Sequence, residues 1–331
     1  MDADSQPTTS RRPWRADAHQ AVTFVELFFD LVFVFAITQI TAYTAHHLTL
    51  DGVARAILLF WLIWWAWTQF TWTLNPADAD HRSVRLLTLV ATAVALAMAI
   101  AVPGALGADG IWFAVPYVVV RVIGLGIQIR VEAENASSDH GGVVRWVGLS
   151  AIGLILVLVG GIASPELRPW IWSVAIIADV IAAIIAGSRD SWDLDAGHMS
   201  ERHGGVVIIA LGESIIITGI GISGSPRTPE LVAAVGAALV VVCLLWWSYF
   251  GWLKDALEHA FADADRRLVG TLARDAYSLA HFPLIGGIIG FAAAVELIVG
   301  HPADPAPLAV VVALASGIVL FVGSSAVAYW R

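Results

Sequence analysis

The chain has 331 residues, of which 58% are hydrophobic and only 14% charged, and its formal net charge is −9. Its mean hydropathy of +0.78 is far above that of an ordinary water-soluble domain. This composition excludes a typical cytosolic enzyme and argues against a nucleic-acid partner. The single cysteine, Cys243, excludes an internal disulfide and a cysteine-rich metal site.

Apolar runs of about 20 residues, the length that crosses the hydrocarbon core as a helix, follow one another with short polar breaks. They predict an all-α, polytopic transmembrane helix bundle with about ten spans. The spans are predicted at residues 22–45, 53–74, 84–102, 111–129, 144–162, 169–187, 204–222, 231–252, 277–299 and 307–329. Residues 1–21 are expected to form a cytoplasmic polar tail and residues 22–331 a single transmembrane domain. The longest breaks, 188–203 and 253–276, are interpreted as cytoplasmic loops.

The distribution of basic residues predicts the orientation, because Lys and Arg accumulate in cytoplasmic segments. With the N-terminus inside, only Arg55, Arg168 and Arg227 of the 18 Lys and Arg residues fall in outer segments, and Arg121 lies within a span. The expected location is a bacterial inner (plasma) membrane, with the lipid bilayer as the partner of the outer surface.

A weak parallel repeat relates helices 1 and 2 to helices 7 and 8. Residues 62–70 and 244–250 both contain a Leu-Trp-Trp-type stretch, at an offset near 180. Helix 1 carries Asp30 eleven residues after His19, and helix 7 carries Glu213 ten residues after His203. Repeats of this kind are common in transporters. A repeated six-helix unit predicts twelve spans, so a chain of ten is either lacking C-terminal spans or a shortened variant.

Ionisable side chains within spans are costly, and each is a functional hypothesis. Counting ~1.5 Å per residue from the predicted helix ends, we expect Asp30, Arg121, Asp179 and Glu213 to share a layer near the midplane. One interpretation is a structural charge pair of Arg121 with one or two of the acids, such as Asp179. The other is that an acid without a matching cation carries a proton.

Further titratable residues lie toward the predicted cytoplasmic side. Glu26 stands four residues before Asp30, hence on the same helix face, and His281 begins the ninth span; both are candidates for a proton relay. The 188–203 loop ends in a group of polar residues: His198, Glu201, Arg202 and His203. Their spacing matches no established metal motif, so no metal or cofactor is expected. Ser200 is predicted to cap the following helix, with Glu201 and Arg202 at the membrane surface.

Four blocks of the chain resemble the bacterial low temperature requirement protein A (LtrA) family. They are residues 25–36, residues 75–85, residues 198–204 running into 211–214, and residues 281–283 with Glu296. The resemblance implies a multi-pass membrane protein, often longer at the C-terminus, without implying a reaction. It marks as signature positions Glu26, Asp30, His198, Glu201, Arg202, Glu213 and Ser214.

These observations lead to a proton-coupled transporter or channel-like permease for a small solute or ion as the first functional hypothesis. Asp30 and Glu213 would form its central site, Arg121 and Asp179 would tune the charge, and Glu26 and His281 would connect the site to the cytoplasm. One alternative is a membrane-embedded enzyme acting on a lipid or prenyl chain. Another is a membrane sensor or scaffold for cold or stress adaptation, in which the acids only pair. The sequence specifies neither the substrate nor the oligomeric state.

Overall fold

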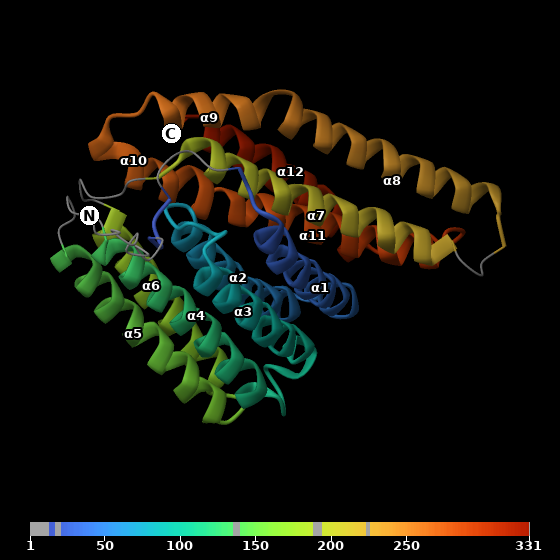
Figure 1. Cartoon of the computed structure of the whole chain (residues 1–331). Helices are drawn as coiled ribbons and strands as arrows, with labels where there is room; N and C mark the ends of the chain where they lie inside the picture. The colour runs from blue at the N-terminus through green and yellow to red at the C-terminus, as the bar shows by residue number, and fades with distance from the viewer. Residues whose placement is uncertain (1–12, 17–20, 135–139, 188–193, 223–225, 331) are drawn as a thin grey trace, which may run out of the picture.

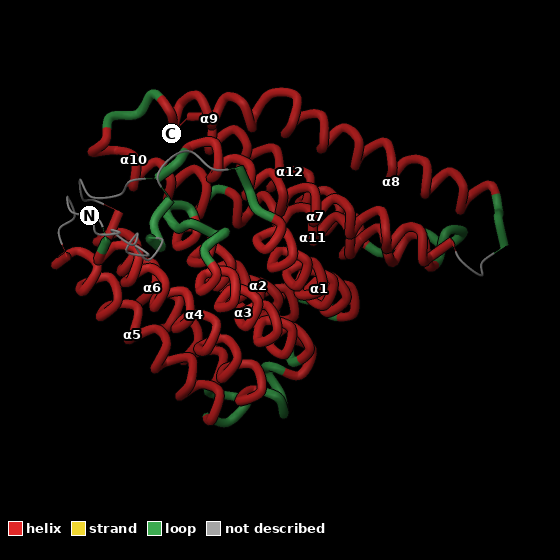
Figure 2. The backbone as a smooth tube through the Cα atoms, in the orientation of Figure 1, coloured by secondary structure: helices red, strands yellow, loops and turns green. Residues whose placement is uncertain are grey.

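The computed structural model describes the chain except for residues 1–12, 17–20, 135–139, 188–193, 223–225 and 331 (Figure 1). The helices are α1 (Phe24–His46), α2 (Leu50–Leu74), α3 (Arg82–Ile100), α4 (Gly110–Ala133), α5 (His140–Ile162), α6 (Arg168–Gly187), α7 (Ala196–Ile222), α8 (Pro229–Ser248), α9 (Lys254–Ala262), α10 (Arg266–Leu272), α11 (His281–Gly300) and α12 (Leu308–Trp330). A 3-10 turn, η1, covers Val102–Gly104, and two π-helical segments are η2 (Tyr249–Leu253) and η3 (Ala273–Leu279). Figure 2 shows that helix is the regular structure throughout the described residues.

Nine helices of the described chain are long and apolar enough to cross a membrane. Two of them are continuous through a π-helical segment: Pro229–Ala262 joins α8 to α9, and Leu268–Gly300 joins α10 to α11. The remaining predicted span corresponds to α5, whose described apolar stretch, Trp146–Ile162, is shorter. The chain is therefore an all-helical, multi-pass membrane protein, as its hydropathy predicted.

Both long predicted loops contain helix among their described residues, which corrects that part of the sequence interpretation; residues 188–193 of the first loop lie outside the described residues. α7 already begins at Ala196, inside the predicted 188–203 loop. The predicted 253–276 loop contains α9, α10 and most of η3. On α9, Leu257 and Phe261 stand four residues apart and are both buried, so one apolar face keeps the helix packed on the bundle beyond the apolar span.

α1 and α2 lie between two groups of helices (Figure 1). One group is formed by α3 to α6, and the other includes α7, α11 and α12, with α8 at the outside. α2 is the central helix: Trp64, Trp65 and Trp67 expose only 2%, 4% and 1% of their surface. Trp246 and Trp247 of α8, which the predicted repeat matches to them, expose 46% and 71%, so the two tryptophan segments occupy different environments.

α11 and α12 approach each other most closely at two glycines. A Cβ atom at Gly287 would lie 2.5 Å from the backbone oxygen of Gly317, and one at Gly317 would lie 2.6 Å from the oxygen of Gly287. Small residues at a membrane helix interface allow the two backbones to approach each other in this way. The Gly-Gly-Ile-Ile-Gly stretch of α11 thus supplies a packing face.

A short segment before α1, residues 13–16, which we call the N-terminal strap, is bound to the turn after α2. Ala16 donates to the carbonyl of Pro76 (3.1 Å), and Asp78 donates to that of Trp14 (2.7 Å). The backbone N–H of Trp14 also donates to the carboxylate of Glu134, at the end of α4, at 2.7 Å. The strap therefore joins α4 to the α2–α3 turn; most of the predicted 1–21 tail lies outside the described residues.

Candidate functional site

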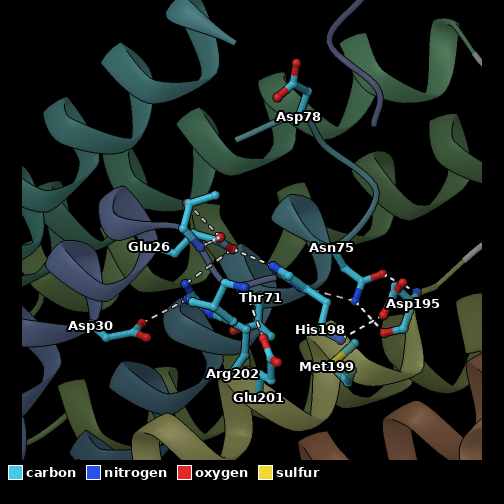
Figure 3. Close-up of polar contacts among 12 residues, drawn as sticks. Glu26, Asp30, Thr71, Asn75, Asp78, Asp195, His198, Met199, Glu201 and Arg202 are labelled. Atoms are coloured by element: carbon cyan, nitrogen blue, oxygen red, sulfur yellow. Dashed lines mark hydrogen bonds and ion pairs between the residues drawn. The ribbon is translucent and has the colours of Figure 1, made fainter. Parts of the chain in front are cut away.

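A cluster of buried charges lies where α1 packs against α7 (Figure 3). Glu26 is in the first turn of α1, and its Oε2 accepts hydrogen bonds of 2.9 Å from both the N–H and the hydroxyl of Thr23. Its Oε1 lies 3.0 Å from Nε2 of His198 and 3.5 Å from Nη1 of Arg202. These three charged or titratable side chains expose at most 1% of their surface. The capping bonds thus orient Glu26 so that its second oxygen faces α7.

Asp30 lies one turn further along α1 and shares Arg202 with Glu26. Its Oδ1 accepts from Nη2 of Arg202 (2.9 Å) and from the indole N–H of Trp67 on α2 (2.8 Å). The guanidinium carbon of Arg202 also lies 5.7 Å from the Trp67 ring centroid. Because a charge buried in an apolar interior is stable only when it is paired and hydrogen-bonded, Arg202 is the counter-charge of both acids.

The start of α7 explains why Arg202 points inward rather than to the membrane surface. Asp195 caps the helix: its carboxylate accepts from the backbone N–H of His198 at 2.8 Å. The predicted cap, Ser200, is a buried residue inside the helix, and Arg202 is buried too, so both predicted positions were wrong. Glu201 does face outward, and it accepts from the backbone N–H of Val22 at 3.0 Å. Because α7 begins eight residues earlier than predicted, this segment is helical rather than a loop, and one face of it is buried.

Asn75, directly after α2, attaches the α2–α3 turn to the same site. Its side-chain oxygen accepts from the N–H of Asp195 (2.7 Å), and its amide donates to the Asp195 carbonyl (2.9 Å). The amide nitrogen also lies 3.4 Å from Nδ1 of His198 (Figure 3). A His198 ring that accepts at Nδ1 carries its proton on Nε2, the atom that faces Glu26.

Arg121 and Asp179 form a second buried pair, between α4 and α6. The guanidinium donates two hydrogen bonds to the carboxylate, at 3.1 and 3.2 Å, and a third to the hydroxyl of Tyr117 at 2.8 Å. Arg121 and Asp179 expose 0% and 1% of their surface. Arg121 therefore has its own acid and is not the partner of Asp30.

Glu213 lies on α7, eleven residues beyond Arg202. It is 2% exposed, lies within hydrogen-bonding reach of Thr38 on α1, and is close to Glu296 on α11. Its Oε1 is buried and has no hydrogen-bond partner among the described residues. Eleven helical residues correspond to ~16 Å along the axis.

The four residues expected in one layer are thus separated. Asp30 belongs to the Arg202 cluster, Arg121 and Asp179 form their own pair, and Glu213 lies deeper along α7. The expectation of a joint Asp30–Glu213 site was wrong, because α7 begins earlier than predicted and Glu213 lies eleven residues, or ~16 Å, beyond the Arg202 that pairs with Asp30. Asp30 and Glu213 do lie along the same α1–α7 interface, about three helical turns apart.

His203 and His281 contact each other across the Trp67 ring from Asp30. We call these two rings the histidine cluster. The ring centroids of the two histidines are 5.0 Å apart, and His203 stands edge-on to Trp67 at 5.0 Å. His281 uses both nitrogens: Nδ1 lies 2.8 Å from the carbonyl of Ala276, and Nε2 lies 2.8 Å from the hydroxyl of Tyr249. Tyr249 and Ala276 both belong to π-helical segments, which occur often at functional sites.

An apolar groove of about 600 Å³ is lined by residues of α1, α2, α11 and α12. Its lining includes Phe60, Phe282 and Gly286, and it contains no Asp, Glu, His, Lys or Arg. The groove ends beside Phe282, whose ring stacks on Phe60 at 4.9 Å and lies next in the chain to His281. The polar side chains in its lining are the hydroxyls of Thr44, Thr49 and Ser316.

Two partners at the site were missed by the sequence interpretation, Arg202 as the counter-charge and Trp67 as a donor. A signal was present in the spacing: Glu26 and Asp30 are four residues apart, and so are His198 and Arg202. Two helices that run in the same direction match such pairs turn for turn. No group of three or more His, Cys, Asp or Glu side chains suited to a metal ion occurs within the described part of the chain.

Comparison with known proteins gives one family and one relative. The family model described as "Bacterial low temperature requirement A protein (LtrA)" matches residues 21–331. The chain is 30% identical over 289 residues to the uncharacterised protein RA0937 of Rhizobium meliloti (strain 1021), an alignment that covers 85% of this chain and 70% of that protein. No solved structure matches the chain.

Proposed function

The chain belongs to the bacterial low temperature requirement A family, and on that premise we propose that it is a proton-coupled transporter of a small solute or ion in the bacterial inner membrane. The supporting observation is a series of buried ionisable residues along the α1–α7 interface. In order from the start of α1 the series contains Glu26 with His198, Asp30 with Arg202, and Glu213 near Glu296. Ionisable groups inside a membrane bundle mark proton and substrate pathways.

The series has two parts with different roles in this proposal. Arg202 neutralises Asp30 and Glu26, so adding a proton to Asp30 removes one of its two counter-charges and weakens the attachment of α7 to α1. Glu213 has no such cation beside it in the described structure. In this proposal, Glu213 binds the proton in the deeper half of the series. Its protonation shifts the α1–α7 interface between two arrangements.

The two alternative functions differ in what supports them. An enzyme acting on a lipid needs ionisable groups beside the hydrocarbon chain, and the apolar groove has none in its lining. A sensor or scaffold needs the acids only as structural pairs, an arrangement that Arg121 and Asp179 exemplify. The transporter is favoured because Glu213 is buried without a counter-charge, which a purely structural role does not require.

Proton movement into liposomes loaded with a pH-sensitive dye tests the proposal. We expect the wild-type protein to pass protons, alone or with an added solute, and Asp30→Asn and Glu213→Gln each to abolish the flux. Glu201→Gln is the matched control, since Glu201 neighbours Arg202 but faces outward. Gel filtration and thermal unfolding show whether each variant is folded. A flux that persists in both acid variants contradicts the proposal, and equal silence of all proteins across candidate solutes favours the sensor.

A further inference from the structure

A second set of buried polar atoms lies beside the histidine cluster, on η3 and on the face of α7 that turns away from Glu26. Ser200 and His203 come from α7 and Tyr277 from η3, and all three side chains expose at most 2% of their surface. The Ser200 hydroxyl, the Tyr277 hydroxyl and Nε2 of His203 are each buried without a completed hydrogen bond in the described structure. Buried polar atoms are normally paired, and clusters that are not mark ordered water or a functional role.

The hydrogen-bonding pattern of His203 leaves one nitrogen available. Its Nδ1 lies 2.9 Å from the carbonyl of Met199 and must donate to it, so the proton of the neutral ring is on Nδ1. Nε2 therefore carries a lone pair. In His281 both nitrogens already have partners, which makes Nε2 of His203 the acceptor that remains in the histidine cluster.

Aromatic rings surround this acceptor. The Tyr277 ring centroid lies 4.8 Å from that of His203, and those of Trp67 and Trp64 lie 5.0 and 6.2 Å away, with their planes at 83° and 70° to the imidazole ring. The face of an aromatic ring attracts a cation and its edge does not. A proton on His203 would therefore lie among three aromatic rings and next to one other cation, Arg202.

A line of oxygen atoms leads from the histidine cluster toward the end of the bundle that carries the N-terminal strap. The Ser200 hydroxyl lies near both the Tyr277 phenol and the carboxylate of Glu258 on α9, without a completed bond to either. Glu258 is 37% exposed and pairs with Lys254 at 3.0 Å. It is thus the member of the line that water reaches directly.

Glu26 is a poorer entrance than Glu258. The Glu26 carboxylate is fully buried, with both oxygens held by Thr23, His198 and Arg202. A group that is closed off by its own ion pairs exchanges protons with water slowly, whereas Glu258 is partly exposed at the end of the oxygen line.

We propose that protons enter through Glu258, Ser200 and Tyr277 and are bound at Nε2 of His203. This proposal rests on the proposed transport function and assigns the cytoplasmic entrance of that site. In one transfer, protonated Glu258 gives its proton to Ser200, Ser200 gives its own to Tyr277, and Tyr277 gives its own to His203. Both hydroxyls end neutral, Glu258 returns to the carboxylate, and one bridging water between neighbours leaves this balance unchanged.

A proton on His203 would act on the first cluster through charge. Arg202 directly precedes His203 in the chain and also contacts the Trp67 ring. A second cation at His203 therefore repels Arg202 from Trp67 on α2 and favours its pairing with Asp30 and Glu26. The titratable or charged groups around His203 are Arg202 on α7, His281 on α11, Tyr277 on η3, Tyr249 on η2, and Lys254 and Glu258 beyond them on α9.

Deuterium exchange at the C2 carbon of each histidine ring, measured by mass spectrometry over a pH series, tests the proposal without requiring transport. This exchange proceeds through the protonated ring, so its rate reports how favourable the protonated form of His203 is. In Tyr277→Phe, which removes the oxygen proposed to accept from protonated Nε2, we expect the exchange at His203 to slow roughly tenfold, the factor produced by ~1.4 kcal/mol of lost stabilisation of the protonated ring. Tyr249→Phe is the matched control, because it removes an equally buried phenol that bonds His281 instead.

The outcomes separate this proposal from the transport function. Slower exchange at His203 in Tyr277→Phe and in Ser200→Ala, but not in Tyr249→Phe, supports the entrance whether or not flux is detected in liposomes. Equal exchange in Tyr277→Phe and Tyr249→Phe overturns it. Proton flux that depends on Asp30 and Glu213 but is unchanged by Tyr277→Phe and Glu258→Gln also overturns the entrance while leaving transport standing.

Discussion

At the scale of single residues, Arg202 is a buried guanidinium that faces two carboxylates from consecutive turns of α1. Its distances of 3.5 Å to Glu26 and 2.9 Å to Asp30 show that both acids share it, although Glu26 also lies 3.0 Å from His198. Removing one partner of a buried ion pair leaves an uncompensated charge, whereas replacing the whole set leaves none. The cost of a substitution here therefore depends on what remains.

Arg202→Met tests this dependence. We expect it to lower the free energy of unfolding by about 3–5 kcal/mol, the usual cost of breaking a buried pair, and the triple variant with Glu26→Gln and Asp30→Asn to recover a large part of that loss. Thermal unfolding in detergent, followed by circular dichroism, measures both. Arg55→Met serves as the control, since its pair with Asp51 is exposed and should contribute less than about 1 kcal/mol. A triple variant as unstable as Arg202→Met would contradict the interpretation.

At the scale of elements, helix contacts are set by small residues as well as by charge. Gly287 and Gly317 allow α11 and α12 to touch backbone to backbone. Membrane helices associate through such packing because lipid tails are as apolar as the side chains. A methyl group at this contact must separate the helices.

Gly287→Ala should accordingly destabilise the α11–α12 pair. Its Cβ would lie 2.5 Å from a backbone oxygen that cannot move aside alone, and such overpacking costs ~1–3 kcal/mol. Gly323→Ala on α12 provides the comparison, as a Cβ there meets nothing within 4 Å. Thermal unfolding of the two variants should differ by several degrees; equal stability would show that the helices can separate without cost.

At the scale of the whole molecule, the N-terminal strap joins parts that are far apart in the chain. Through Glu134 and the α2–α3 turn it connects the end of α4 to the turn that carries Asn75, and Asn75 in turn holds Asp195 at the start of α7. The charge cluster is therefore framed by segments from four places in the sequence.

Release of the strap can be detected by proteolysis. Glu134→Gln replaces a charged acceptor of the Trp14 N–H (2.7 Å) with a neutral one, so trypsin should cleave after Arg15 faster than in the wild type. Glu166→Gln, at a fully exposed position between α5 and α6, is expected to leave the cleavage rate unchanged. Identical rates in all three proteins would mean that the backbone pairing with Pro76 and Asp78 holds the strap by itself.

Much of the fold was predictable because each span is a long, mainly apolar run. The continuation of some helices beyond their apolar run was not predictable. The 253–276 segment is polar enough to resemble a loop, yet the burial of Leu257 and Phe261 keeps it helical. Arg168 illustrates the same limit at a single residue. The sequence assigned it to an outer loop, but it is 4% exposed and donates to backbone carbonyls of Ala105, Gly160 and Ala163.

The sequence by itself determined that this protein is a bundle of membrane-spanning helices with acids inside it, since in a bilayer every backbone group of an apolar run must be bonded within its own helix. It also identified Glu26, Asp30, Arg121, Asp179 and Glu213 as residues that need partners. Only the tertiary structure decided which partners they have. Pairing depends on how each helix is rotated and where it begins, and the earlier start of α7 brought His198 and Arg202 to α1 instead of leaving them at the surface.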